Sequence, residues 1–314
     1  INKYSKKITS KVVPLESQTP SMKALYVLIF ILFSPIYFAQ NILISEDFEG
    51  TNLPFGWTIN TNASDGGWNL GTNQTLESQW WSIAPHGNFI GTNDDDCDCD
   101  KSMDYLIMPV LDFSNSTVIA LQFENYYDGG SFGGDTETAT LEYSLDNGNS
   151  WTVLSEINGF DDGAWDAQSI DLSSLAGNTS VLIGFHYNDN GGWMFGWAID
   201  DVLLFEPEGL DAAITSLSVN SSQDAPITIP ITGTVSNVGA ETINSFDITW
   251  SLGGGMAYTQ NFSGLNLPSL ATYDFTHQDT WTIAQSGLYS LDVAISNVNG
   301  QATDDNPSND VYYQ

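Results

Sequence analysis

The hydrophobic positions of this chain fall into short runs separated by clusters of glycine, asparagine, aspartate and serine. The runs are rich in β-branched and aromatic residues, and they span 118–123, 139–144, 151–157, 180–187 and 197–205. No stretch sustains the spacing of three to four residues that marks an amphipathic helix. Between two of the runs, Asn147-Gly148 favours a hairpin, because both residues tolerate the positive φ angles of a tight turn. The pattern is typical of an all-β protein.

The composition changes at Glu206-Pro207-Glu208-Gly209, a segment typical of a linker. Eight of the ten tryptophans precede it, and the chain that follows is poorer in aromatic residues but again strand-like. About 275 residues follow position 39, which is enough for two domains of ordinary size. We therefore expect two β-sandwiches, at 40–207 and 208–314.

The first 39 residues predict an export signal. Met22 and Lys23 precede an apolar stretch, 24–38, which Pro35 interrupts, and Ala39-Gln40 is a plausible cleavage point. The alternative is a membrane anchor, but about 15 apolar residues are few for a bilayer that requires ~20. We expect 1–39 to be leader and signal peptide, and the protein to be secreted or held at the cell surface through a further C-terminal segment.

Charge excludes whole classes of partner. The chain has 39 acidic residues, of which only Glu16 precedes position 40, so 39 − 1 = 38 lie beyond it. Lys101 is the one lysine or arginine in that part. Nucleic acids and anionic lipid surfaces are bound mainly by lysine and arginine, so both are excluded as partners. Metal ions, neutral sugars and proteins remain.

Three blocks occur in order in the first domain, and they contain 46–57, 93–109 and 196–202. Their most distinctive parts are Glu46-Asp47-Phe48-Glu49-Gly50, the Asp/Cys-rich run that follows Asn93, and Trp197-Ala198-Ile199-Asp200-Asp201. Together they resemble the cleaved-adhesin and choice-of-anchor J group of bacterial secreted domains, relatives of the MAM-type jelly roll. The resemblance implies a jelly-roll sandwich used for adhesion or attachment, commonly with structural Ca²⁺.

The carboxylates themselves favour a calcium site, because Ca²⁺ takes six to eight oxygen ligands. Five aspartates crowd into seven positions, 94–100, where they repel one another without a counter-ion. In a jelly roll the first and last strands can be neighbours, which would bring Glu46 or Glu49 to Asp200 or Asp201. A solvated acidic loop is the alternative. The candidate ligands of structural Ca²⁺ are Glu46, Glu49, Asp94, Asp96, Asp98, Asp100, Asp200 and Asp201.

Cys97 and Cys99 are the only cysteines. Exported proteins usually oxidise their thiols, so a strained local disulfide between the two is the favoured interpretation. A zinc site is the alternative, but it needs four ligands, and the nearest histidine in the sequence, His86, is better interpreted as a loop or core residue.

Two aromatic segments, Trp80-Trp81 and 191–195, are candidates for ligand binding. Tryptophan faces stack on sugar rings, and glycine-flanked aromatics lie in loops that a ligand can reach. We name Trp80, Trp81 and Trp193 as candidate ligand-binding residues, with burial in the core as the alternative for each. Trp57, Trp151 and Trp197 are expected in the core.

Residues 144–151 match the Asp-box of sialidases, in which a serine and an aspartate brace a hairpin. The box is a structural turn. A sialidase also needs arginines to bind the substrate carboxylate, and this chain has none, so that activity is excluded.

The second domain resembles the CARDB-type immunoglobulin-like module of bacterial surface proteins. The resemblance rests on Val235-Ser236-Asn237-Val238-Gly239, on the strand-like 246–251 and on the Asp/Asn-rich 304–310. It implies a spacer or adhesion module with an immunoglobulin-type sandwich.

No arrangement of the three histidines or of the serines matches a known catalytic motif. The leading hypothesis is therefore a calcium-stabilised adhesion or attachment module that binds extracellular glycan or protein and has no catalysis of its own. One alternative is the non-catalytic C-terminal part of a secreted hydrolase such as a peptidase. The other is a carbohydrate hydrolase that uses an Asp/Glu pair.

Overall fold

The computed structural model describes residues 40–97, 99–160, 163–219 and 224–314. The expected leader and signal peptide at 1–39 lie outside the described residues, as does Asp98. Within the described ranges, no helix is long and apolar enough to span a membrane.

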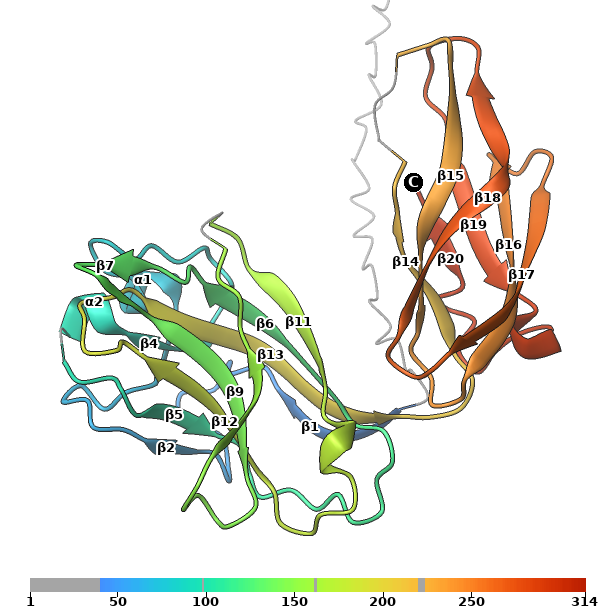
Figure 1. Ribbon diagram of the computed structural model, residues 1–314. Coiled ribbons are helices and arrows are strands. Elements are labelled where there is room, and N and C mark those ends of the chain that lie inside the picture. The colour runs from blue at the N-terminus through green and yellow to red at the C-terminus, as the bar shows by residue number, and fades with distance from the viewer. Residues whose placement is uncertain (1–39, 98, 161–162, 220–223) are drawn as a thin grey trace, which may run out of the picture. The chain divides into compact units, whose positions relative to one another are not determined.

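The first domain is a sandwich of two mainly antiparallel sheets (Figure 1). The strands of the first sheet are, in spatial order, β11 (Asp166–Asp171), β6 (Ala120–Tyr127), β13 (Gly196–Pro207), β4 (Phe89–Asn93) and β3 (Asn69–Gly71), with β1 (Gln40–Glu46) also paired to β13. The second sheet comprises β10 (Thr152–Glu156), β9 (Thr138–Ser144), β12 (Leu182–Asn188), β5 (Asp104–Ile107) and β2 (Thr58–Asn60).

The period-two pattern of the sequence places one face of each sheet in the core. On β12, Ile183, Phe185 and Tyr187 are fully buried, because alternate residues of a strand point to the same face. Trp57 and Trp197 belong to the same hydrophobic cluster, which confirms the expectation for these two tryptophans. The large aromatic side chains bury much apolar area and supply a main part of the hydrophobic stabilisation.

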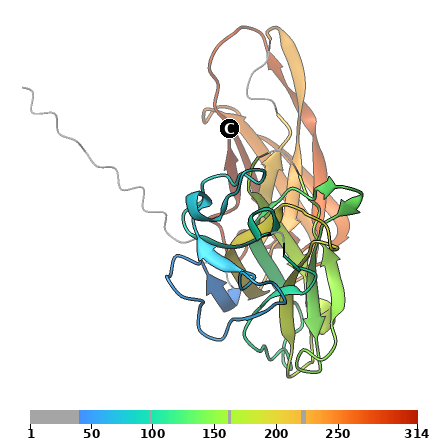
Figure 2. The same ribbon diagram turned by 90° about the vertical axis from the view of Figure 1, so that its left-hand side faces the viewer.

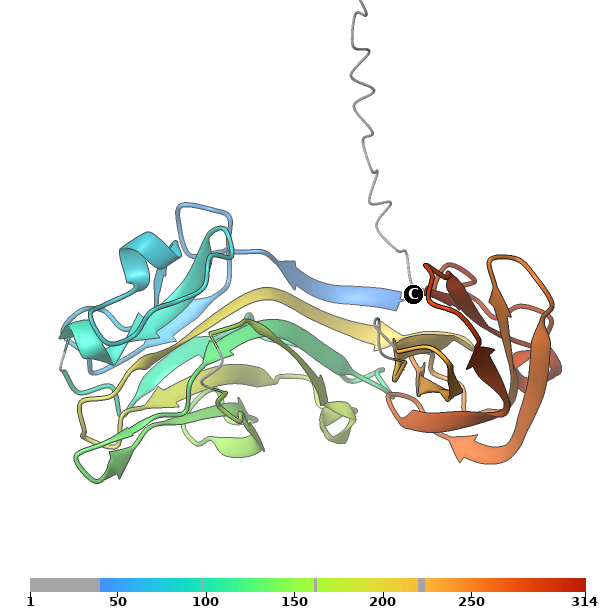
Figure 3. The same ribbon diagram turned by 90° about the horizontal axis from the view of Figure 1, so that it is seen from above.

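The first and last strands of this sandwich are neighbours. Strand β1 pairs antiparallel with β13, with Glu46 opposite Val202, and Figure 3 shows the two ribbons side by side. The chain around Glu49 therefore lies close to the middle of β13, where Asp200 and Asp201 are located.

Short elements lie at one end of the sandwich. They are α1 (Asn73–Leu76), α2 (Asp94–Cys97) and the hairpin of β7 (Ser131–Phe132) and β8 (Asp135–Thr136). A 3₁₀ turn, η1 (Ser173–Leu175), follows β11.

The second domain is also a sandwich, and its long strands are coloured yellow to red in Figures 1 and 2. One sheet has the order β14 (Ala212–Leu217), β15 (Ile227–Asn237), β18 (Thr272–Ile283). The other has the order β17 (Tyr258–Leu267), β16 (Ile243–Leu252), β19 (Leu291–Ser296), β20 (Val311–Tyr313), and the 3₁₀ turn η2 (Val298–Gly300) follows β19 in the chain. Its core is separate from that of the first domain and includes Trp250 and Phe275. The expected fold class, a jelly-roll sandwich followed by an immunoglobulin-like sandwich, is confirmed.

The hairpin between β9 and β10 forms as the sequence predicts. Asn147 and Gly148 have φ angles of 61° and 83°, and Ser144 Oγ donates to Asp146 Oδ1 at 2.7 Å. The expectation that Trp151 is a core residue was wrong. Its ring is half-buried on the outer face of the second sheet, where it stacks on Tyr105 with centroids 4.9 Å apart. Gly184 leaves the room for this stack, since a Cβ there would lie 3.0 Å from each ring.

Lys101 is fully buried, although it is the only lysine or arginine after position 23. Its Nζ lies 2.8 Å from Asp65 Oδ2 and 3.3 Å from Asp104 Oδ2. Asp104 is itself fully buried and accepts further hydrogen bonds from the hydroxyls of Thr61 and Thr92. The lysine therefore neutralises a carboxylate inside the protein, outside the acidic run that precedes it in the sequence.

We expect Lys101→Met to lower the free energy of unfolding by about 3–5 kcal/mol, because it leaves the Asp104 carboxylate buried without its cation. Urea denaturation followed by tryptophan fluorescence measures this change. The double variant Lys101→Met/Asp104→Asn removes the uncompensated charge and should recover part of the loss. Equal stability of the wild type and the single variant would contradict the structural role of the ion pair.

Candidate functional site

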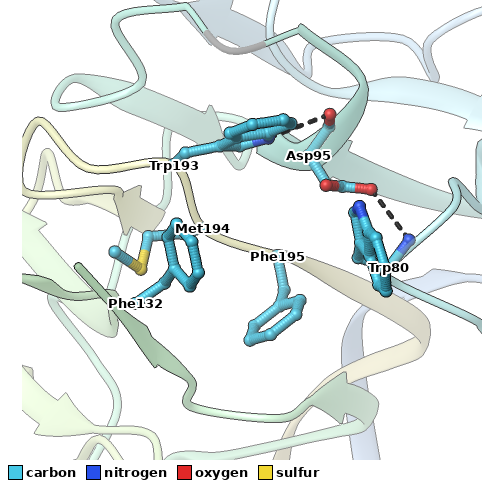
Figure 4. A pocket seen from close by; sticks show the side chains of 6 residues that line it. All are labelled: Trp80, Asp95, Phe132, Trp193, Met194 and Phe195. Carbon is cyan, nitrogen blue, oxygen red and sulfur yellow. Dashed lines mark hydrogen bonds between the residues drawn. The ribbon is translucent and has the colours of Figure 1, made fainter.

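An apolar pocket of about 410 Å³ opens at the end of the first sandwich that carries α2 and the hairpin β7–β8. This volume falls within the range typical of small-ligand sites. The described residues that line it are Trp80, Asp95, Phe132, Trp193, Met194 and Phe195 (Figure 4).

Asp95 holds both exposed tryptophans of this pocket. Its Oδ2 accepts a hydrogen bond from the backbone N–H of Trp80 at 3.0 Å. Its backbone carbonyl accepts one from Trp193 Nε1 at 3.2 Å. The two side chains remain 65% and 46% exposed, so apolar ring surface faces solvent. Exposed aromatic residues of this kind mark binding surfaces more often than folding requirements.

Trp81 does not belong to the pocket, and its assignment as a candidate ligand-binding residue was wrong. The side chain is 0% exposed and packs with Ile83, Phe89 and Tyr126 in a small core of its own. Trp80 and Trp81 are adjacent in a segment outside the regular strands, so one points to solvent while the other points inward.

Two buried carboxylates fix the wall of the pocket formed by 193–195. Asp94 Oδ2 accepts from the backbone N–H of Met194 at 2.6 Å, and the backbone N–H of Asp94 donates to the carbonyl of Phe195 at 2.8 Å. Glu137 Oε2 accepts from the backbone N–H of Phe195 at 3.1 Å. Both acids are almost fully buried. Carboxylates that accept backbone N–H groups form charge-assisted hydrogen bonds, which are stronger than neutral ones.

Glu137 also fixes the opposite wall. Its Oε1 accepts from the backbone N–H of Gly130 at 2.8 Å, at the base of the hairpin that carries Phe132. Gly130 is in close contact with Phe195, because a Cβ at this position would collide with the phenyl ring. Burial raises the pKa of Glu137 to about 7, although hydrogen bonds from Tyr187, Gly130 and Phe195 act in the opposite direction.

A second, more polar pocket of about 590 Å³ shares Trp80 with the first. Glu77 and Asp128 are the acidic members among the described residues that line it. Trp80 therefore separates two adjacent cavities.

The acidic run at 94–100 is not assembled around one point in the described residues. Asp94 binds the backbone of Met194, and Asp96 is exposed on α2. Asp100 is exposed and accepts hydrogen bonds from the backbone and hydroxyl of Ser102, which lower its pKa. Cys97 and Cys99 form a disulfide with a Cα–Cα distance of 5.1 Å.

The other group of candidate ligands does come together, beside the paired strands β1 and β13. The Oδ2 atoms of Asp200 and Asp201 lie 3.7 Å and 3.5 Å from His86 Nε2. All three ligand atoms are within 4.8 Å of one another. Asp201 has a φ of 48°, which aspartate tolerates, at an irregularity in the pairing of β13 with β6.

The negative charge of this cluster is not compensated by the protein alone. Asp200 is only 3% exposed, and burial raises its pKa to about 8, with smaller contributions from the negative charges of Asp201, Glu49 and Asp47. Glu49 accepts from the backbone and side chain of Asn88, which places it near His86. Glu46 Oε1 accepts from the backbone N–H of Phe48 at 3.0 Å.

Calcium fits this donor set through its carboxylate oxygens, and a bound divalent cation would neutralise Asp200. His86 is the residue in the cluster that favours a transition metal, because imidazole nitrogen is a poor calcium ligand. His86 lies far from both Glu49 and Asp200 in the sequence, so the residue pattern did not indicate that it joins their cluster. Glu137 was also missed, because a single glutamate in a strand-rich segment carries no distinctive pattern.

A scan against protein-family models and a search of curated proteins found no match. Solved structures similar to the chain include the K1 cleaved adhesin domain of Lys-gingipain from Porphyromonas gingivalis (21% identity; 51% of this chain and 96% of that chain; TM-score 0.36). They also include the CBM22-1 xylan-binding domain from Paenibacillus barcinonensis (16% identity; 53% and 95%; TM-score 0.34).

A third similar structure is a CARDB domain from Pyrococcus furiosus, in complex with di-metal ions (17% identity; 34% of this chain and 85% of that chain; TM-score 0.27). At these identities and TM-scores, the similarities assign neither a ligand nor a function to this chain.

The buried Glu137 gives the pocket a testable pH signature. A carboxyl whose pKa is about 7 when folded and ~4.3 when unfolded contributes stability that is complete below pH ~4. This contribution to the free energy of unfolding is lost as the pH rises towards 7. The total loss is roughly 1.4 kcal/mol for each unit by which the folded pKa exceeds the unfolded pKa. We expect Glu137→Gln to reduce the fall of the free energy of unfolding with rising pH, as measured by urea denaturation between about pH 4 and pH 8.

The exposed residue Glu156 supplies the control, because Glu156→Gln should keep the wild-type slope. The readout is the slope of stability against pH and not the absolute stability, which the amide can change by itself. An unchanged slope in Glu137→Gln would show that this carboxyl titrates normally.

Proposed function

We propose that the chain is a secreted binding module without catalytic activity, which attaches to extracellular glycan through the pocket between Trp80 and Trp193. The observation that carries the proposal is that two exposed tryptophans line one apolar pocket, where Asp95 binds the backbone of Trp80 and the indole of Trp193. Rigid aromatic faces contribute large contact area at a small entropic cost, and sugar rings offer C–H faces that match them.

The geometry favours binding over hydrolysis. A glycosidase needs two carboxyl groups on either side of the scissile bond. Among the described residues that line the apolar pocket, Asp95 alone is acidic, and its Oδ2 already accepts from Trp80. A binding role also suits the alternative in which this chain is the non-catalytic part of a larger secreted hydrolase.

We expect Trp193→Ala to weaken glycan binding about tenfold or more, because truncation of an anchoring aromatic commonly costs 1–2 kcal/mol or more. A glycan array identifies a ligand, and isothermal titration calorimetry measures its affinity. Phe55→Ala is the matched control, since Phe55 is fully exposed and is not among the residues that line the pocket. Equal losses in both variants, or turnover of the bound glycan, would contradict the proposal.

We further propose that Ca²⁺ binds between β13 and the chain that follows β1, and stabilises the first sandwich. Asp200 and Asp201, with Glu49 and Asp47 nearby, would supply oxygen ligands. A cation that binds only the native state stabilises it in proportion to the logarithm of its concentration over the Kd. The buried Asp200 carboxylate supports this proposal, since in the protein alone it lies in a region of uncompensated negative charge.

We expect calcium chelation to lower the Tm of the wild type by several degrees. Asp200→Asn should have a Tm that no longer responds to calcium and that exceeds the Tm of the chelated wild type, because the buried charge is gone. Differential scanning fluorimetry with calcium, zinc or chelator measures both effects. Asp96→Asn, on the exposed side of α2, should retain the full calcium response.

A wild-type Tm that is the same with calcium and with chelator would remove the calcium proposal. A response to zinc alone would assign the site to a transition metal held by His86.

A further inference from the structure

The two cavities on either side of Trp80 are lined by acidic side chains without basic ones. Asp95 lies in the apolar pocket, and Glu77 and Asp128 lie in its polar neighbour. None of the described lining residues of either cavity is a lysine, arginine or histidine. The potential in both cavities is therefore negative, and low-dielectric walls focus such a potential.

Lys101 cannot neutralise this region. It is the one lysine or arginine of the described residues, and its Nζ is buried between Asp65 and Asp104. The Asp95 carboxylate accepts a hydrogen bond from the backbone N–H of Trp80, which carries only a partial positive charge. A ligand that brings a full positive charge would gain interaction energy here that a neutral ligand would not.

The aromatic side chains favour the same kind of ligand. Trp80, Trp193, Phe132 and Phe195 surround the apolar pocket, and the first three are well exposed (Figure 4). The face of an aromatic ring is electron-rich and attracts an ammonium group within about 6 Å, most strongly when the ring is tryptophan. An alkylammonium ion is recognised by this combination, since the ring faces and the carboxylate both attract its positive charge.

We propose that the ligand of these cavities is an oligosaccharide with free amino groups, such as a glucosamine oligomer. This inference rests on the glycan-binding function proposed above and names its substrate class. The sugar rings stack on Trp80 and Trp193, and the protonated amines lie near Asp95 in one cavity and near Glu77 and Asp128 in the next. Two cavities that share Trp80 suit consecutive sugar units, whereas a single lysine side chain would fill only one.

The test is isothermal titration calorimetry at about pH 6, where aliphatic amines are protonated. The probes are a glucosamine tetramer, its fully N-acetylated counterpart, a neutral glucose tetramer and a tetralysine peptide. We expect the glucosamine tetramer to bind about tenfold or more tightly than either neutral sugar, and its affinity to fall as salt rises.

Asp95→Asn separates specific recognition from general attraction between a polycation and an anionic protein. The amide oxygen can still accept the Trp80 N–H, while the negative charge is removed. We expect this variant to lose about tenfold more affinity for the glucosamine tetramer than for the neutral glucose tetramer, because only the amino sugar interacts with the charge that is removed. Asp96→Asn removes the same charge from the exposed side of the same helix and should change neither affinity.

The other outcomes are distinct. Equal affinity for charged and neutral tetramers overturns the amine specificity and leaves the glycan-binding function standing. Preferential binding of tetralysine overturns the amino-sugar assignment, and equal losses in Asp95→Asn and Asp96→Asn show non-specific attraction only. If none of the sugars binds here and the glycan array is also empty, the proposed function itself fails.

Discussion

The structure depends on one electrostatic constraint, the lack of basic side chains to pair with its carboxylates. Thirty-eight acidic residues follow position 39 with a single lysine, and that lysine is buried against Asp65 and Asp104. Buried carboxylates therefore use backbone N–H groups as their partners. Asp94 and Glu137 bind the segment 193–195 in this way. Because buried polar groups need hydrogen-bond partners, these contacts hold the segment 193–195 in place.

Where backbone donors do not suffice, we propose that the unpaired negative charge attracts a cation or a cationic ligand. Asp200 is buried beside other acids, and its pKa is raised to about 8. A cation bound next to it would stabilise the ionised carboxylate. Asp95 accepts hydrogen bonds from Trp80 at its carboxylate and from Trp193 at its backbone carbonyl, and no basic side chain is among the described residues that line its pocket. A metal ion at Asp200 and a cationic ligand at Asp95 would supply the positive charge that the basic residues of this chain do not provide there.

The sequence predicted the fold class and the Asn147-Gly148 turn, because strand periodicity and turn chemistry are local properties. It also indicated that the chain near Glu49 meets Asp200, once a jelly roll was assumed. Residue types alone could not show whether the run 94–100 converges on one ion. In the structure, the carboxylates of Asp94, Asp95 and Asp100 bind three different partners. The sequence also could not show that Trp80 is exposed while Trp81 is buried, because outside a regular strand no periodicity assigns side chains to one face or the other.

Both candidate sites lie on the stretch from Trp193 to Asp201. The residues just before β13 form a pocket wall, and the irregular pairing of the same strand with β6 presents Asp200 and Asp201. A cation that joins β13 to the chain after β1 would fix the middle of the strand, while Asp94 and Glu137 fix its beginning. The backbone contacts and the cation would then stabilise the beginning and the middle of the same strand, so the anionic composition supports the binding geometry as well as the charge of the site.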